Sequence, residues 1–259
     1  MNSNEGFFLL EDVLNKDVLQ KLLTKISNAY ISESAQNRFG GSISGHLNCM
    51  PGSEARELID NIKETKILDE LSKFFSVNIK EYNLSIGANI NLPGSHYQHM
   101  HTDSNYFDEF FILNIPLIST TESNGSISII PMSHTKHYSY IKYKLKGLYN
   151  NRIRLNQEVG SCLVRSSNLW HRGTPNKTNE IRPMINLVFT KNKSSDNSDF
   201  LLSNIDNHPD LVGPIVFKNN WYSASKKGII WEYITVKIPV IYSIKRIIMS
   251  IIRPLGTST

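Results

Sequence analysis

The sequence predicts a mainly β protein, a sandwich or barrel, with helices flanking it at both ends of the chain. Apolar residues recur at helical spacing over the first third of the chain. From about residue 79 the period changes toward two, in short runs of β-branched and aromatic residues separated by Gly, Pro, Asn and Ser. A broad apolar stripe at helical spacing returns near the end of the chain. Strands that follow helices in this way are typical of a β-sandwich or barrel buttressed by helices.

Two helical segments are predicted in the N-terminal part of the chain. Residues 8–30 carry Val, Leu and Ile at spacings of three and four, so we expect the first helix there. A second run opens at Pro51 and continues to Phe75, with charged side chains between its apolar positions. We therefore expect residues 1–78 to form helices that buttress the β core.

The middle of the chain, residues 79–191, is predicted to be the β core. Its strand-like runs are short and alternate with turn residues. Between them lies an insertion, residues 136–154, which carries six basic residues and four tyrosines and no acidic residue. The predicted strands cover residues 82–92, 110–118, 126–130, 161–166 and 184–190.

The last part of the chain, residues 192–259, is predicted to be a polar linker followed by a basic amphipathic tail. Residues 192–210 are rich in Asn, Ser and Asp, and a helix of roughly four turns follows Pro239. This helix is too short and too charged to span a bilayer. Three roles stay open for it: packing on the domain or on a second copy, peripheral contact with an anionic membrane through residues 239–253, or no role.

Charge and cysteine content exclude several classes of protein. The chain has 259 residues and a net charge of +5, and the tail from Leu211 onward holds seven basic residues against one acidic residue. The rest is therefore near neutral, and without a Lys/Arg-dense module we expect no nucleic-acid binding. Cys49 and Cys162 stand in no metal-binding spacing, and the N-terminus lacks the basic region of a signal peptide. We expect a cytoplasmic protein, with a position peripheral to a membrane left open by the tail.

Two histidines and one aspartate in the β core predict a metal site. His101 and Asp103 follow a strand-like segment and a Pro-Gly turn, and residues two apart in a strand point to the same face. His171 follows a later predicted strand. Two imidazoles and one carboxylate on one face are typical ligands of non-haem Fe(II), and they leave three positions for a co-substrate and O₂.

An arginine downstream of these ligands predicts where a co-substrate is held. Arg182 stands eleven positions beyond His171. Its guanidinium can hold the far carboxylate of a 2-oxo acid through two parallel hydrogen bonds. This combination favours an oxidative enzyme over a binding module. A zinc hydrolase can use the same three ligands, but it has no need of Arg182.

Two blocks of the sequence resemble the phytanoyl-CoA dioxygenase-like family. The run NGSISIIPMSHT at residues 124–135 looks like the family's Asn-Gly and Pro-Gly-Ser-His signature. Residues 159–189 look like its block around the second histidine and the arginine. With the His-x-Asp pair upstream, the resemblance covers roughly residues 83–191. Met132 stands where the family usually has Gly, and Ser161 where it usually has Asp, so we expect these turns to differ.

The resemblance implies a double-stranded β-helix, the cupin-like jelly roll, which uses Fe(II), 2-oxoglutarate and O₂. By matching position, the metal ligands would be His101, Asp103 and His171. Arg182 would hold the distal carboxylate of 2-oxoglutarate. Asn114 falls where many members carry a Trp that borders the co-substrate, which makes it a candidate cofactor-binding residue.

Hydroxylation of a small or conjugated metabolite, a glycan or a lipid is the activity that the resemblance implies. The stretch that matches residues 136–154 often covers the mouth of the site in this fold, and a basic lid of this kind favours an anionic substrate. Two alternatives stay open: a non-hydroxylating oxidation such as desaturation or epimerisation, and a catalytically silent jelly-roll binding protein. The sequence names neither the substrate nor the oligomeric state.

Overall fold

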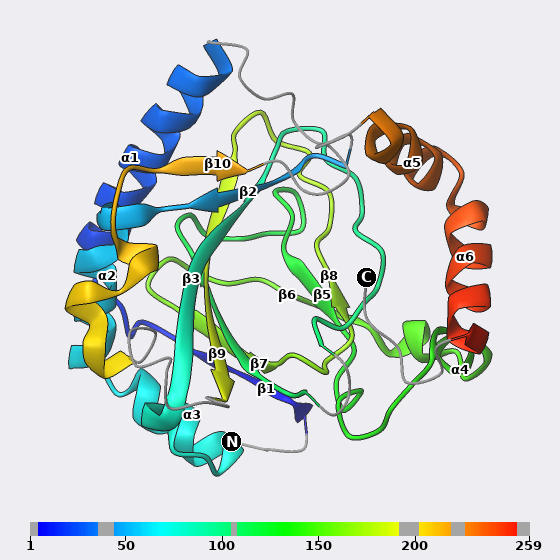
Figure 1. Ribbon diagram of the computed structural model, residues 1–259, viewed down its shortest axis with the longest axis horizontal. Helices are drawn as coiled ribbons and strands as arrows, with labels where there is room; N and C mark the ends of the chain where they lie inside the picture. Colours follow the sequence, from blue (N-terminus) through cyan, green and yellow to red (C-terminus); the bar gives the residue numbers. More distant parts are fainter. Residues whose placement is uncertain (1–4, 36–43, 105–107, 192–201, 219–225, 253–259) are drawn as a thin grey trace.

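Two antiparallel sheets form the centre of the protein (Figure 1). The computed structural model describes residues 5–35, 44–104, 108–191, 202–218 and 226–252. Within these residues the larger sheet has seven strands in the order β1-β7-β4-β9-β3-β2-β10, and the smaller has three in the order β6-β5-β8. Antiparallel sheets with flanking helices confirm the predicted jelly-roll class. The strands are β1 (Phe7–Leu10), β2 (His46–Met50), β3 (Tyr82–Asn91), β4 (Phe111–Pro116), β5 (Ile127–Ile129), β6 (Ile153–Leu155), β7 (Cys162–Ser166), β8 (His171–Arg172), β9 (Arg182–Lys191) and β10 (Val216–Lys218).

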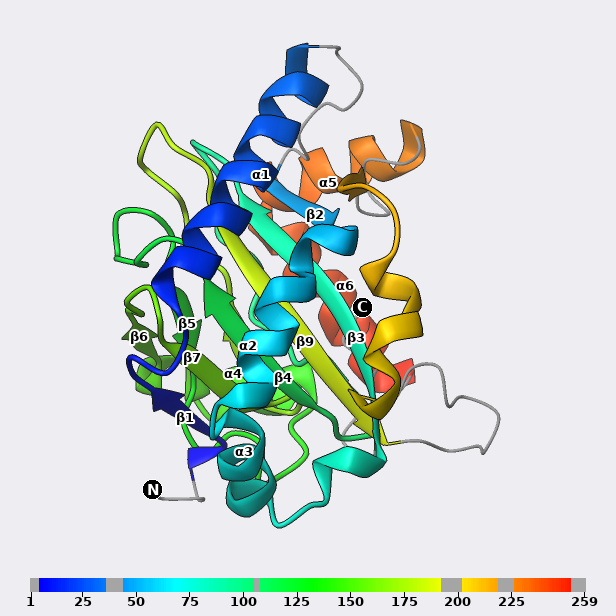
Figure 2. The same cartoon turned by 90° about the vertical axis from the view of Figure 1, so that its left-hand side faces the viewer.

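Helices lie on two sides of these sheets. Three come from the N-terminal part and cover the larger sheet, and Figure 2 shows two of them, α1 and α2, lying across its face. Three others lie near the smaller sheet, on the opposite edge of the molecule (Figure 1). The α-helices are α1 (Lys16–Ala35), α2 (Arg56–Glu64), α3 (Ile67–Phe75), α4 (Tyr140–Leu145), α5 (Lys226–Lys237) and α6 (Pro239–Ile252).

Alternation along the strands of the larger sheet decides which residues face the helices. In β9, the side chains of Ile185, Leu187 and Phe189 belong to the apolar core that α1 to α3 cover. Asn186 and Val188, which lie between them, line a cavity on the opposite face of the sheet. Successive side chains of a strand point to opposite faces, so the period of two builds a core on one side and the wall of a site on the other.

The prediction of a helix over residues 8–30 is wrong at its start. The first apolar residues form β1, which pairs antiparallel with β7, and the helix begins only at Lys16. Asn15 Oδ1 accepts the backbone N–H of Asp17 at 2.8 Å, and this side-chain cap fixes the start of α1.

The single helical run predicted from Pro51 to Phe75 is divided into a 3₁₀ turn and two helices. Thr65 separates α2 from α3 and has extended backbone. Its hydroxyl donates to the carbonyl of Ile62 at 2.8 Å and accepts the N–H of Ile67 at 3.3 Å. Local hydrogen bonds of Thr compete with those of the helix, which is the reason for the break.

The five predicted strands are confirmed as β3, β4, β5, β7 and β9. The five strands that were not predicted are short: none of them is longer than five residues. Each of them is held by pairing with a strand from another part of the chain, which no local pattern contains.

The turn after β5 keeps a backbone that favours glycine although Met132 occupies it. Met132 has a φ of 63°, in the left-handed region, and its side chain is exposed. The next residue ties the turn to the neighbouring chain: Ser133 Oγ donates to the carbonyl of Ile130 at 2.7 Å and accepts the N–H of Trp170 at 2.9 Å. Ser133 of the Ser-His segment therefore has a structural role in this protein.

The insertion and the tail lie side by side. Within residues 136–154 the chain forms α4, and α6 contacts both α4 and α5. The predicted tail helix is confirmed as α6, whereas α5 was not predicted. Of the polar segment, residues 192–201 lie outside the described residues, as does Arg253 of the predicted membrane contact. Among the described helices, none has the length and hydropathy needed to cross a membrane.

Candidate active site

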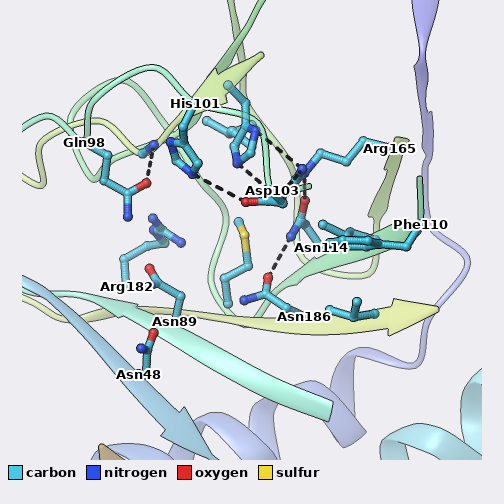
Figure 3. Close-up of a pocket in the computed structure, with 16 residues that line it drawn as sticks. Asn48, Asn89, Gln98, His101, Asp103, Phe110, Asn114, Arg165, Arg182 and Asn186 are labelled. Atoms are coloured by element: carbon cyan, nitrogen blue, oxygen red, sulfur yellow. Dashed lines mark hydrogen bonds and ion pairs between the residues drawn. The ribbon is translucent and has the colours of Figure 1, made fainter. Parts of the chain in front are cut away.

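A cavity of about 330 Å³ lies between the two sheets (Figure 3). Its lining includes Asn114 of β4, Arg165 of β7 and Arg182 of β9 from the larger sheet, and Ile127 of β5 and His171 of β8 from the smaller one. All five residues predicted for the site, including His101 and Asp103, line this one cavity.

The three predicted metal ligands converge at one end of the cavity. Asp103 lies between the histidines: its Oδ1 is 3.5 Å from His101 Nε2, and its Oδ2 is 3.5 Å from His171 Nε2. One ligand atom from each of the three residues lies within 4.8 Å of the others. This spacing and the N, N, O donor set fit a metal ion bound on one face.

Backbone hydrogen bonds place the two histidines beside each other. His101 and His171 exchange their N–H and carbonyl groups at 3.0 and 2.9 Å in an isolated antiparallel bridge. The Asp103 N–H donates to the carbonyl of Ser167 at 2.9 Å. The prediction that His101 and Asp103 project from one strand is therefore wrong in detail, because both lie in the loop after β3.

Both imidazoles present an unprotonated nitrogen to Asp103. His101 Nδ1 lies 2.7 Å from the carbonyl of His99, and His171 Nδ1 lies 3.0 Å from the carbonyl of Leu169. A carbonyl oxygen only accepts, so Nδ1 carries the proton and Nε2 keeps its lone pair for a metal. Burial, together with the charge of Arg165, lowers the pKa of His171 to about 3, so this ligand is neutral at physiological pH.

Arg165 is a residue of the site that the sequence did not single out. Its Nη1 lies 2.8 Å from Asp103 Oδ2 and 3.5 Å from His171 Nδ1. Burial raises the pKa of the Asp103 carboxyl, but the attraction of His171 and Arg165 outweighs this and holds the pKa well below its ordinary value. His171 is neutral near pH 7, so at that pH the positive charge of Arg165 is the attraction that favours the ionised carboxylate.

Asn114 connects Arg165 to the next strand. Its Oδ1 accepts a hydrogen bond from Arg165 Nε at 2.9 Å, and its Nδ2 donates to Asn186 Oδ1 at 2.7 Å (Figure 3). Both polar groups of the Asn114 side chain thus have partners within the protein. These contacts fit a residue that positions Arg165, and direct contact of Asn114 with a cofactor stays a prediction.

Replacing Arg165 with Met is expected to lower the free energy of unfolding by about 1–3 kcal/mol, because a partly buried carboxylate loses its charged partner. The ion pair stabilises the folded state above the ordinary aspartate pKa of 3.8, and this contribution is lost as the pH falls toward the lower folded-state pKa of Asp103. In the variant the pKa of Asp103 rises, so metal binding is expected to begin to weaken at a higher pH. Denaturant unfolding and metal titration against pH measure both effects, and unchanged profiles would contradict this role of Arg165.

Arg182 also lines this cavity. It is a buried cation that has no counter-ion among the described residues. It begins β9, only 4% of it is exposed, and its Nε has no hydrogen-bond partner in this part of the chain. Burial lowers the pKa of its guanidinium to about 10. Figure 3 shows the side chain pointing into the cavity beside Asn89. An unpaired buried charge is costly, so this end of the cavity fits an anionic group such as the far carboxylate of a 2-oxo acid.

Comparison with known proteins identifies the family and supports the fold. Residues 3–184 match the phytanoyl-CoA dioxygenase (PhyH) family. AviO1 from Streptomyces viridochromogenes Tue57 is 15% identical over 73% of this chain and 91% of its own, with a TM-score of 0.59. The non-haem α-ketoglutarate-dependent carbocyclase SnoK from nogalamycin biosynthesis is 13% identical over 82% and 92%, with a TM-score of 0.57.

A third solved structure is the epimerase SnoN in complex with Fe³⁺, α-ketoglutarate and nogalamycin RO. It is 14% identical over 73% of this chain and 80% of its own, with a TM-score of 0.53. Identities this low show a shared fold. The family match covers well over half of the sequence, and the cavity holds a cluster of two histidines and one aspartate. The chain belongs to the phytanoyl-CoA dioxygenase family, and it is an iron- and 2-oxoglutarate-dependent oxygenase.

Proposed function

We propose that His101, Asp103 and His171 hold the iron and that Arg182 holds the far carboxylate of 2-oxoglutarate, in the oxidation of a small anionic metabolite. The observation that carries the proposal is the presence of a convergent N, N, O ligand set and an unpaired buried guanidinium in one cavity of the described structure. The cavity volume of about 330 Å³ is in the range of small-molecule sites.

Bound iron and 2-oxoglutarate supply the oxidising chemistry, in which O₂ is consumed, 2-oxoglutarate becomes succinate and CO₂, and a C–H bond of the substrate is oxidised. The protein supplies position and a dry environment. Arg165 orients Asp103, and the Asn114–Asn186 hydrogen bond fixes Arg165. Apolar side chains of the larger sheet exclude water from one wall of the cavity, notably Ile112. No side chain is required as a general base.

A second cavity, beneath the insertion, supports an anionic substrate. It has a volume of about 370 Å³ and shares Gln98 with the first. Lys144 of α4 and Arg172 of β8 line it, and none of its described lining residues is Asp or Glu. The guanidinium carbon of Arg172 lies 4.3 Å from the ring centre of Tyr97, and its Nε is buried without a hydrogen-bond partner among the described residues. Cations between aromatic rings favour a substrate that carries a carboxylate or phosphate on a sugar or ring.

Replacing Arg172 with Met is expected to raise the KM for an anionic substrate by about 10- to 100-fold, because one charge-assisted contact is lost. The KM for the co-substrate 2-oxoglutarate is expected to stay unchanged. The assay is succinate release with a panel of phosphate- and carboxylate-bearing metabolites. Lys80→Met, which removes an exposed cation outside both cavities, is the matched control. A substrate whose KM is the same in the Arg172 variant would contradict an anionic site in this cavity.

The outcome of the oxidation is measured on the product. Hydroxylation, which we propose, adds one oxygen atom from O₂ to the substrate. Epimerisation leaves the substrate's mass unchanged, and desaturation or ring closure removes two hydrogen atoms. The similarity to SnoN and SnoK, an epimerase and a carbocyclase, keeps these as the second candidate function. A protein that binds the metabolites without releasing succinate would instead be the silent binding protein.

A further inference from the structure

Helix α6 turns its apolar side toward solvent. Five of its side chains, spaced by four, three, one and three positions, form one exposed stripe. Their exposed fractions lie between 38% and 68%. A helix on the surface of a soluble domain usually buries such a stripe in the core, so the orientation of α6 is inverted. The stripe consists of Val240, Ile244, Ile247, Ile248 and Ile251.

The polar and aromatic side of the same helix packs on the protein. Ser243 Oγ lies 3.2 Å from the hydroxyl of Tyr140, and the ring of Tyr242 stacks on His99 with centroids 3.3 Å apart. The guanidinium carbon of Arg246 lies 5.4 Å from the ring centre of Tyr140. These contacts fix the rotation of α6 about its axis. The apolar stripe is therefore part of the surface of the folded protein.

The two neighbouring helices also expose apolar side chains. Figure 1 shows α4, α5 and α6 along one edge of the molecule, far from α1 to α3, and α6 contacts both neighbours. Leu145 of α4 is 82% exposed, and Ile230 and Tyr233 of α5 and Ile238 after it are also exposed. We name the stripe of α6 together with these four residues the outer helical face.

The charges on these three helices are nearly all positive. Exposed lysines lie on α4 and α5, and the one acidic residue in the sequence of the three helices is Glu232. Glu232 is buried, and its Oε1 accepts the N–H of Ser44 at 3.1 Å, so it lies beneath the surface and not among the exposed lysines. The exposed lysines outside the second cavity are Lys142 of α4 and Lys226, Lys227 and Lys237 of α5.

We propose that the outer helical face binds the surface of an anionic lipid membrane. Isoleucines that enter the interface beside cations that meet lipid phosphates are the chemistry of a peripheral amphipathic helix. A symmetric contact with a second copy would bring the same lysines against each other. Nucleic acid would leave the isoleucine stripe without an apolar partner. The observations thus favour a membrane, and the binding does not depend on the metal site.

The same three helices border the second cavity. Tyr140 of α4, Thr235 and Val236 of α5 and Ser243 of α6 line it. The helices that would lie on the membrane are therefore the helices that border this cavity. Membrane binding would place the cavity beside the lipid headgroups.

Flotation of the full chain with lipid vesicles tests the proposal. Vesicles of phosphatidylcholine and phosphatidylglycerol in equal parts are compared with vesicles of phosphatidylcholine alone. The variant Ile244→Gln/Ile248→Gln/Ile251→Gln changes exposed side chains, so it is expected to fold normally. Ile31→Gln/Val212→Gln, at exposed apolar residues elsewhere, is the control. We expect the wild type and the control to float with the anionic vesicles, and the triple variant to bind at least about tenfold more weakly.

Four results would overturn the proposal. The first is a wild type that does not float with anionic vesicles, and the second is a triple variant that floats as well as the wild type. The third is equal binding of the wild type to neutral and anionic vesicles. The fourth is a wild-type dimer in analytical ultracentrifugation that the triple variant dissociates, which would assign the outer helical face to a second copy. Melting temperatures of all variants show whether a loss of binding comes from unfolding.

Discussion

Replacing Asp103 with Ala is expected to abolish iron-dependent succinate formation and to lower the affinity for iron by at least about 100-fold. Loss of a group that merely orients a metal ligand already costs about 10- to 100-fold, and Asp103 is the proposed carboxylate ligand itself. Its two oxygens lie close to the Nε2 atoms of both histidines. Metal titration and succinate release measure the two effects separately.

The Asp103 variant needs controls for folding, because Arg165 would lose its carboxylate partner. Asp103→Asn keeps the shape of the side chain and is expected to lose activity with a smaller fall in melting temperature. Asp60→Ala, at an exposed carboxylate on α2, is expected to behave as the wild type. Full turnover by purified Asp103→Ala would show that this residue is not a ligand.

Replacing Arg182 with Met is expected to raise the KM for the co-substrate 2-oxoglutarate by at least about 100-fold. Two charge-assisted hydrogen bonds of about 1.5–3 kcal/mol each would be lost. The free energy of unfolding is expected to stay the same or to rise, because Arg182 is buried without a counter-ion in the described part of the protein. Steady-state kinetics and denaturant unfolding measure the two changes.

A conservative variant separates charge from geometry at this position. Arg182→Lys keeps the positive charge but loses the planar pair of donors, so its KM is expected to fall between those of the wild type and the Met variant. A KM that is unchanged in Arg182→Met would move the carboxylate site to another residue of the cavity. A large fall in stability would show that Arg182 has a structural role instead.

Much of the fold could be predicted because the long strands carry a clear period of two. β3 and β9 pair along their full length, from Tyr82 opposite Lys191 to Asn91 opposite Arg182, and both were recognised. The strands that were missed owe their existence to partners distant in sequence. β8 has two residues and is set by its pairing with β5, a contact that no local pattern contains.

Part of the site could also be predicted from the sequence. His101, Asp103, His171 and Arg182 stand in a recognisable order and spacing, and the structure brings them into one cavity. Arg165 was missed because its partners come from other segments of the chain. One signal was available: a charged residue in the apolar run SCLVRS has to find a partner once the strand is buried.

The tail shows a further limit of sequence patterns. The apolar stripe after Pro239 predicts an amphipathic helix, and α6 confirms it. The pattern does not tell which side of the helix meets the protein. The orientation of α6 depends on Tyr140 and His99, which contact Ser243 and Tyr242 on one side of the helix and leave its isoleucines exposed.

The visible absorbance of the anaerobic Fe(II) complex tests most directly whether the histidines, Asp103 and Arg182 form one site for iron and 2-oxoglutarate. Adding 2-oxoglutarate to the iron-loaded wild type is expected to produce a weak charge-transfer band. The band is expected to disappear in His171→Ala, to persist in His137→Ala and to require more 2-oxoglutarate in Arg182→Met. Its absence from the iron-loaded wild type, or its persistence in His171→Ala, would contradict the proposed site.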